Sequence, residues 1–215
     1  MNQLNTAILL FTLTLGHAWA AGVEGNSNTK LGQGAGTAAG DDDQGVFIGR
    51  NAGLSTTDGL YSTFVGSSAG YSNTAGYYNT FLGNNAGYSN LTGHFNTFLG
   101  FGAGYSNTGG ENTFLGHTAG YYNTTGHANT FLGTYAGGQN ATGFVNTFHG
   151  SYAGYLNTTG YANTFIGSSA GYSNTTGNSN LVLGVAAGFS NATGNANIFL
   201  GHNAGYFETG SNRLY

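Results

Sequence analysis

The chain has 215 residues, of which 41 are glycine, and it contains neither proline nor cysteine. Charged residues make up 5% of the sequence, and with only three lysines and arginines the formal net charge is −4. So few cations exclude an electrostatic footprint for nucleic acid or for an anionic membrane surface. Without cysteine, no disulfide framework can form in an oxidising compartment.

The first twenty residues have the pattern of a secretory signal peptide. An apolar run from Ala7 to Gly16 is followed by Ala18-Trp19-Ala20, an A-x-A-type cleavage site. We therefore expect residues 1–20 to be removed, residues 21–27 to be a leader, and the mature chain to be secreted or held at a cell surface of bacterial type. The alternative is an uncleaved N-terminal anchor, although the run is short for a membrane span. No integral membrane segment is expected after cleavage.

A tandem repeat with a period of 17 residues occupies residues 28–215. The motif Asn79-Thr80-Phe81-Leu82-Gly83 recurs as residues 96–100, 129–133 and 163–167. A fixed period of this length indicates one short supersecondary unit stacked on copies of itself. The motif is closed by a glycine in ten full copies: Gly49, Gly66, Gly83, Gly100, Gly116, Gly133, Gly150, Gly167, Gly184 and Gly201. Around Gly32 lies a degenerate first copy, with Lys30 in place of phenylalanine, and a twelfth strand is predicted over residues 212–215.

The repeat predicts an all-β fold. Glycine every few residues disfavours a helix, whereas Thr-Phe-Leu and Tyr between turn signals favour short strands. The copy between Gly100 and Gly116 lacks one residue within residues 107–111, which identifies the Asn-Thr-Thr-Gly segment as the turn. We predict a parallel β-solenoid of about eleven coils with two or three strands each. At about 4.8 Å per coil, the rod would be on the order of 50 Å long.

Two apolar columns run along the predicted rod. The first contains Phe47, Phe64, Phe81, Phe98, Phe114, Phe131, Phe148, Phe165, Val182 and Phe199. The second contains Ile48, Val65, Leu82, Leu99, Leu115, Leu132, His149, Ile166, Leu183 and Leu200. Neighbouring strand residues face opposite sides, so a narrow coil encloses one column and exposes the other. Because soluble monomers rarely expose such a stripe, we expect the rods to associate along their length. The alternative is a bend that turns both columns inward, and the sequence leaves open which column lines the coil.

Small and amide side chains also form columns. Alanine from Ala52 to Ala204 and the glycine after it occur in every full copy, which predicts close backbone approach. A hydrogen-bonded side-chain ladder is predicted for Asn79, Asn96, Asn112, Asn129, Asn146, Asn163, Asn180 and Asn197. Charged residues concentrate near the two ends, where they would cap the stack against edge-to-edge pairing.

The copies N-T-F-L-G-x-x-A-G-Y-x-N-x-T-G resemble the Gly/Asn/Thr-rich repeats of bacterial surface proteins and phage tail-fibre-like proteins. They are more distantly similar to the head repeats of trimeric autotransporter adhesins, and residues 208–215 are similar to the segment that ends such arrays. The resemblance covers about residues 28–215 and implies a trimeric, left-handed β-roll that serves as an adhesive or spacer shaft. The heptad stalk, anchor barrel and C-terminal chaperone or self-cleaving domain of those adhesins have no counterpart in these 215 residues.

An aromatic column is the main candidate for surface binding, with packing as the alternative role. It contains Tyr71, Tyr88, Tyr105, Tyr121, Tyr155, Tyr172 and Tyr206, with Phe189 in one copy. If the leucine column faced a threefold axis, three His149 rings would meet and form an axial ion site. A buried or tolerated histidine is the other interpretation.

Other polar groups give little support for catalysis, a metal or a cofactor, and none is expected. Asp41, Asp42 and Asp43 form the only acidic cluster, in a turn without the calcium motif of β-solenoids. The histidines lack metal-ligand spacing, and no hydrolase triad is visible. N-x-T sequons at Asn90, Asn123, Asn140, Asn157, Asn174 and Asn191 fit either a row of glycans or turn chemistry.

Three functions compete. The first is a secreted structural or adhesive rod that makes many weak contacts with itself and with a host, glycan or abiotic surface. The second is an ice-binding solenoid that uses the turn threonines Thr92, Thr125, Thr142, Thr159, Thr176 and Thr193. The third is a glycan-active enzyme such as a polysaccharide lyase, for which three basic residues are too few. We expect no enzymatic activity.

Overall fold

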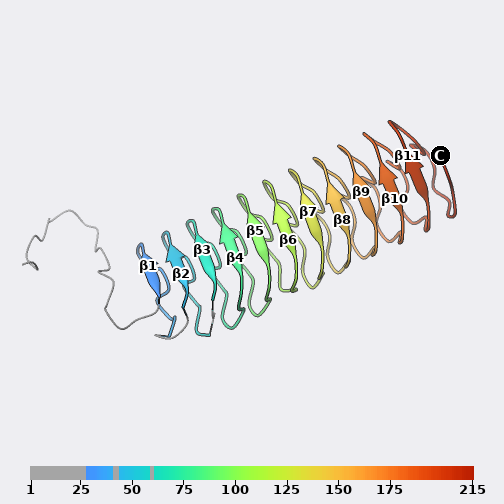
Figure 1. Ribbon diagram of the computed structural model, residues 1–215. Helices are drawn as coiled ribbons and strands as arrows, with labels where there is room; N and C mark the ends of the chain where they lie inside the picture. The colour runs from blue at the N-terminus through green and yellow to red at the C-terminus, as the bar shows by residue number, and fades with distance from the viewer. Residues whose placement is uncertain (1–27, 41–43, 59–60) are drawn as a thin grey trace, which may run out of the picture.

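The computed structural model describes residues 28–40, 44–58 and 61–215. The expected signal peptide, the leader and the cluster Asp41–Asp43 lie outside these ranges. The described chain is a parallel β-solenoid with a 17-residue period and about ten turns. Its coils stack side by side into one rod, with the first strand at one end and the last strand at the other (Figure 1).

All strands belong to one parallel sheet, in which each strand pairs with the strand of the next coil. Each strand has three residues: β1 (Thr29–Leu31), β2 (Val46–Ile48), β3 (Thr63–Val65), β4 (Thr80–Leu82), β5 (Thr97–Leu99), β6 (Thr113–Leu115), β7 (Thr130–Leu132), β8 (Thr147–His149), β9 (Thr164–Ile166), β10 (Leu181–Leu183) and β11 (Ile198–Leu200). Within the described residues no helix has the length and apolarity needed to cross a membrane.

The expectation of two or three strands per coil is wrong, because each coil contains one. The chain leaves the extended conformation at the glycine after each strand, for example at Gly83 with a φ of 144°. Asn85 and Gly87 then adopt φ values of 57° and 60°, so the tyrosine that follows lies in a turn and not on a strand. A Cβ on Gly83 would lie 2.3 Å from the carbonyl oxygen of Gly100 in the next coil. Close backbone stacking thus requires glycine at this position.

Bulky residues also adopt left-handed φ at a second corner of the coil. Phe95 and Val145 both have a φ of 56°, which ordinarily costs about 1–2 kcal/mol per residue. Their backbone N–H groups donate to the preceding coil, at 3.2 Å to the carbonyl oxygen of Tyr77 and 3.1 Å to that of His127. Hydrogen bonds between coils therefore hold a conformation that the isolated residues disfavour.

The phenylalanine column lines the inside of the coil, and the leucine column lies outside. From Phe64 to Phe165, successive rings lie 4.8–4.9 Å apart and within 8° of parallel. These rings are buried together with the alanine column. The structure contradicts the alternative in which both apolar columns turn inward, because a straight three-residue strand cannot direct neighbouring side chains to the same side.

Two asparagine ladders fill the polar half of the interior. The predicted ladder is confirmed: the N–H of Asn96 donates to Oδ1 of Asn79 at 2.9 Å, and this contact repeats along the rod. The second ladder was not predicted. There Nδ2 of Asn140 donates to Oδ1 of Asn123 at 2.6 Å and to the carbonyl oxygen of Gly143 at 2.9 Å. Both ladders are buried, so amide groups supply the hydrogen bonds that the closely packed turns need.

The short copy keeps the register of the sheet. β5 and β6 pair residue for residue, with Phe98 opposite Phe114. The missing residue is absorbed in the turn, where Nδ2 of Asn107 bonds the carbonyl oxygen of Gly109 two residues on. In other coils the same bond spans three residues, as from Asn123 to Gly126. The prediction that length variation marks the turn is confirmed.

The two ends differ from the middle of the rod. Lys30 occupies the phenylalanine column in β1, and its Nζ donates to the carbonyl oxygen of Ala39 at 3.2 Å. At the other end the expected twelfth strand is reduced to a parallel bridge between Ile198 and Leu214. The ring of Tyr215 packs 5.6 Å from that of Phe199.

Candidate functional site

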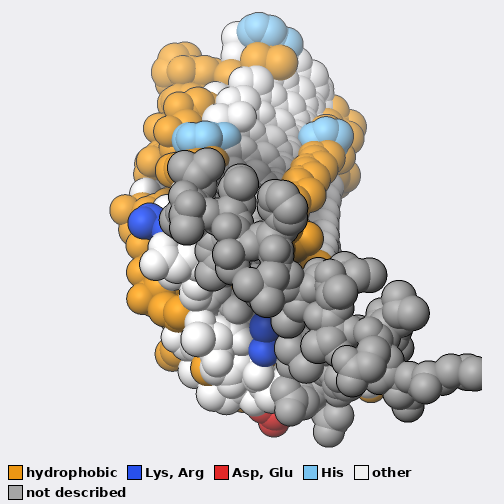
Figure 2. All heavy atoms as spheres, turned by 90° about the vertical axis from the view of Figure 1, so that its left-hand side faces the viewer, with side chains coloured by type: hydrophobic (Ala, Val, Ile, Leu, Met, Phe, Trp, Pro, Cys, Tyr) orange, Lys and Arg blue, Asp and Glu red, His pale blue; other side chains and the backbone are white. Residues whose placement is uncertain are grey.

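The outer face of the sheet is a repetitive surface that runs through all eleven strands of the described rod. On each strand the residues before and after the central one point outward, and on most strands this produces a threonine column and a leucine column side by side. Leu82 is 44% exposed, Leu99 40% and Leu200 50%. Figure 2 looks along the rod from the β1 end and shows exposed hydrophobic side chains gathered in stripes that run along the rod. The sheet thus presents a repetitive surface on which charged side chains are scarce.

The tyrosine column forms a stacked ladder on the turns. Tyr71, Tyr88, Tyr105 and Tyr121 stack at 4.8–5.0 Å and within 6° of parallel. A second stack contains Tyr172, Phe189 and Tyr206 at 4.9–5.0 Å. These rings are half-buried, because each covers the faces of its neighbours and leaves its edge in solvent. The ladder therefore packs and also offers polar edges to a surface.

Stacking also affects the titration of the ladder. Burial raises the pKa of Tyr88, and negative charge on Tyr105 or Tyr71 would raise it further. Burial likewise raises the pKa of Tyr121, with smaller contributions from Tyr105 and Tyr122. The hydroxyl groups of Tyr88 and Tyr121 therefore stay protonated above the ordinary range of tyrosine.

Other stacked aromatic columns were missed by the sequence analysis. Tyr77 stacks on His94 at 5.0 Å, and Tyr78 on Phe95 at 5.3 Å. Further along, Phe144 stacks between His127 and Tyr161 at 5.1 and 4.9 Å. Their common 17-residue spacing was the available signal, but their mixed residue types concealed it.

His149 lies on the outer face of β8, between Leu132 of β7 and Ile166 of β9. It is exposed, so it is not a core histidine. Among residues 28–40, 44–58 and 61–215, no three histidine, aspartate or glutamate side chains are close enough to hold a metal ion. An ion at His149 would require copies of the chain to meet on this face, and that idea stays a prediction.

The turn polar groups fall into two classes. The asparagines of the six sequons point inward and are buried, so a row of glycans on the folded rod is excluded and turn chemistry is the correct interpretation. Thr92, Thr125, Thr142, Thr159, Thr176 and Thr193 are exposed, as an ice-binding ladder would require. The strand threonines, from Thr80 to Thr147, form a second exposed column that the sequence analysis did not single out.

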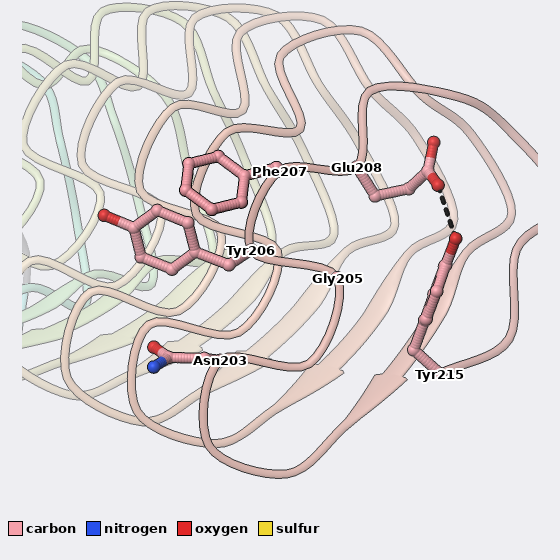
Figure 3. Close-up of a pocket in the computed structure, with 6 residues that line it drawn as sticks. All are labelled: Asn203, Gly205, Tyr206, Phe207, Glu208 and Tyr215. Carbon is pink, nitrogen blue, oxygen red and sulfur yellow. Dashed lines mark hydrogen bonds between the residues drawn. The ribbon is translucent and has the colours of Figure 1, made fainter.

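A cleft of about 790 Å³ opens at the C-terminal end of the stack (Figure 3). Glu208 is its one acidic group and stands in the column of the second asparagine ladder. Its carboxylate accepts hydrogen bonds from the hydroxyl of Tyr215 at 2.6 Å and from the N–H groups of Gly210 at 2.8 Å and Thr209 at 3.0 Å. Arg213 lies 3.6 Å away.

These contacts shift the pKa values of Glu208 and Tyr215 in opposite directions. The hydrogen bond from Tyr215, followed by that from Gly210, lowers the pKa of Glu208, and the same bond to Glu208 raises the pKa of Tyr215. In Figure 3 the rings of Tyr206 and Phe207 lie on the opposite side from this pair. The carboxylate is thus engaged in closing the last coil, and its surroundings are those of a structural cap.

Comparison of the chain with protein-family models, with curated proteins and with solved structures gave no match.

Proposed function

We propose that the chain is a secreted structural or adhesive surface protein, a rod that acts through many weak and identical contacts. The observation that carries the proposal is the repetition of uncharged columns at the surface of the rod: leucine and threonine on the sheet, and half-buried tyrosine on most of the turns. A weak contact repeated at every coil gives avidity without a strong single site.

Self-association is part of this proposal. The half-exposed leucine column is an apolar stripe that His149 interrupts at β8, and such a stripe is stabilised when it is covered. The occupant we propose is a second and a third copy of the same chain, because the stripe is uncharged, straight and as long as the rod itself. The resemblance to trimeric adhesin heads supplies the number of copies and a left-handed coil. The tyrosine ladder then remains outside as the contact surface for a host, glycan or abiotic material.

Adhesion is tested by adsorption of the full chain onto three films on a quartz-crystal balance: mucin glycoprotein, cellulose and a methyl-terminated layer. The test variant carries Tyr71→Ser, Tyr88→Ser and Tyr105→Ser. The matched control carries Thr92→Ser, Thr125→Ser and Thr142→Ser on the neighbouring turn. We expect the wild type and the control to be retained on at least one film, and the tyrosine variant to dissociate at least about tenfold faster. Equal dissociation of all three chains, or no adsorption of the wild type, contradicts an adhesive role.

Ice binding is a second candidate, favoured by the strand threonines. Thr80, Thr97, Thr113, Thr130 and Thr147 form a straight exposed column on a flat sheet. Neighbouring threonines repeat at about 4.8 Å, and the leucine column runs parallel at about 6.7 Å along the strand. Such a two-dimensional lattice suits ordered water better than the turn threonines do. Thermal hysteresis at low protein concentration that disappears in Thr113→Tyr supports this candidate, and its absence from the wild type removes it.

A further inference from the structure

The tyrosine ladder is interrupted at one coil. Gly138 occupies the tyrosine position of the coil that follows β7, between Tyr121 in the preceding coil and Tyr155 in the following one. Elsewhere the position carries an aromatic ring, except for Thr37 in the coil after β1 and Leu54 in the coil after β2. One ring of the ladder is therefore absent between Tyr121 and Tyr155.

A cleft of about 300 Å³ occupies this gap, at the low end of the range for small-molecule sites. Gly138, Tyr121 and Tyr155 are among the residues that line it. Its size fits a single six-membered ring. The coils on both sides keep the 17-residue period, so the gap comes from a missing side chain and not from a longer loop.

Tyr155 has left the register of the ladder. Its ring lies 5.5 Å from that of Tyr172 and is tilted by 28°, whereas Tyr172 and Phe189 stack at 4.9 Å and 5°. It leans toward the gap, because a Cβ on Gly138 would lie 2.8 Å from its Cε2. We therefore expect the ring of Tyr155 to move back into the stacking register when a planar ligand binds against it.

Tyrosines from outside the ladder column also line this gap. Tyr122 stands in a column that carries serine in six of the other coils, such as Ser106. Tyr135 stands in a column of mainly small residues such as Ser68. Its ring meets that of Tyr155 edge-on at 6.2 Å, and the ring of Tyr122 meets that of Tyr121 edge-on at 4.7 Å. The coil that lacks a ring thus has aromatic edges on its rim.

The side chains at the edge of the cleft are uncharged, which indicates the kind of ligand that it would bind. Thr118 and Gln139 line the cleft together with the tyrosines, and no lysine, arginine, aspartate or glutamate does so. The amide of Gln139 makes no hydrogen bond within the described part of the chain, so both its donor and its acceptor are available. An uncharged slot with two apolar walls and a rim of hydroxyl and amide groups suits a neutral ring with apolar faces and hydroxyl groups around its edge.

We propose that the gap at Gly138 binds one hexopyranose ring of a neutral saccharide, stacked between Tyr121 and Tyr155 as the missing rung of the ladder. Gln139 and Thr118 bond the ring hydroxyls from the rim. This inference goes beyond the proposed function, because it concerns a single discrete site and holds whether or not the rod adheres to surfaces.

The test is saturation-transfer NMR on the full chain with the methyl glycosides of glucose, galactose, mannose and N-acetylglucosamine, and with phenol as an aromatic probe. Gly138→Tyr fills the gap. Gly138 does not adopt positive φ, so the backbone accepts a side chain there once Tyr155 returns to register. Leu54→Tyr is the matched control, because it adds a tyrosine to the same column and leaves the gap open.

We expect at least one glycoside to bind the wild type and Leu54→Tyr, and no glycoside to bind Gly138→Tyr. Tyr121→Ala should weaken binding about tenfold through the loss of one stacking face, and it keeps the test valid if Gly138→Tyr does not fold. The proposal is overturned if no glycoside binds the wild type, if only phenol binds, or if neither Gly138→Tyr nor Tyr121→Ala changes the binding.

Discussion

The inside and the outside of this rod follow opposite rules. Inside, phenylalanine, alanine and two columns of asparagine repeat at fixed positions, and nearly all are buried and matched to the coil above and below. Outside, the residue after the strand glycine varies from Arg50 to Phe101 to His117 without any change in the strand register. The buried residues thus determine the conformation of the coil, and the outer residues can vary without changing it.

Neighbouring residues on one strand give the largest contrast between the two sides. Phe98→Ala should lower the free energy of unfolding by about 3–5 kcal/mol, because it removes a fully buried ring and two stacking contacts. Leu99→Ala, one residue on, should cost at most about 1 kcal/mol in a single rod, since that side chain is half-exposed. Urea denaturation followed by circular dichroism measures both. Equal losses would mean that the leucine column is as structural as the phenylalanine column.

The asparagine ladder should show the next largest effect. Asn129→Ala removes the acceptor for the N–H of Asn146 and the donor to the carbonyl oxygen of Gly143, both buried. We expect a loss of about 1–3 kcal/mol, because the buried N–H of Asn146 loses its acceptor, whereas the carbonyl oxygen of Gly143 keeps its hydrogen bond from Asn140. Thr130→Ala, on the outer face beside it, is the control and should change stability by about 0.5 kcal/mol or less. If Asn129→Ala is as mild as the control, the ladder contributes little to stability.

Changes of pH should weaken the hydrogen bond between Glu208 and Tyr215 at the C-terminal end of the rod, both in acid and in alkali. The pKa of Glu208 is lowered in the folded rod, so its contribution is complete above the ordinary carboxyl range and is lost as the pH falls through the lowered value. The pKa of Tyr215 is raised, so the same bond is kept below the ordinary tyrosine range and is lost as the pH rises through the raised value.

Hydrogen exchange at the amide of Leu200, which donates to the carbonyl oxygen of Tyr215, follows this local opening. After correction for intrinsic exchange, we expect protection to fall severalfold at each limit, whereas the amides of β6 and β7 stay protected. Glu208→Gln is the control and should remove the acidic limit. Loss of protection along the whole rod at the same pH would contradict a local cap.

Periodicity made the fold predictable, and the same periodicity hid its details. The columns predicted stacked coils, an enclosed phenylalanine or leucine column and the first asparagine ladder. They could not distinguish extended from left-handed backbone, so Tyr88 was placed on a strand although it follows Gly87 in a turn. The burial of Asn123 was not predicted, because turns ordinarily lie at the surface. Here the turn directs the amide side chain of Asn123 into the core.

The candidate surfaces were predicted unevenly. The tyrosine column was visible because one residue type repeats in it. The vacancy at Gly138 was not, since a single exception in a column gains meaning only when the rings on either side are known to stack. The mixed columns around Phe144 were missed for a related reason. Histidine, phenylalanine and tyrosine all carry a planar ring, but the change of residue type from coil to coil concealed the repeat.

The mass of the chain in solution, measured by light scattering after size exclusion on residues 21–215, tests the central claim that the outer leucine column is an interface and not part of the core. The companion variant carries Leu99→Ser, Leu115→Ser and Leu132→Ser. We predict a trimer for the wild type and a monomer with an unchanged circular dichroism spectrum for the variant. A wild type that is monomeric at all accessible concentrations would contradict the account.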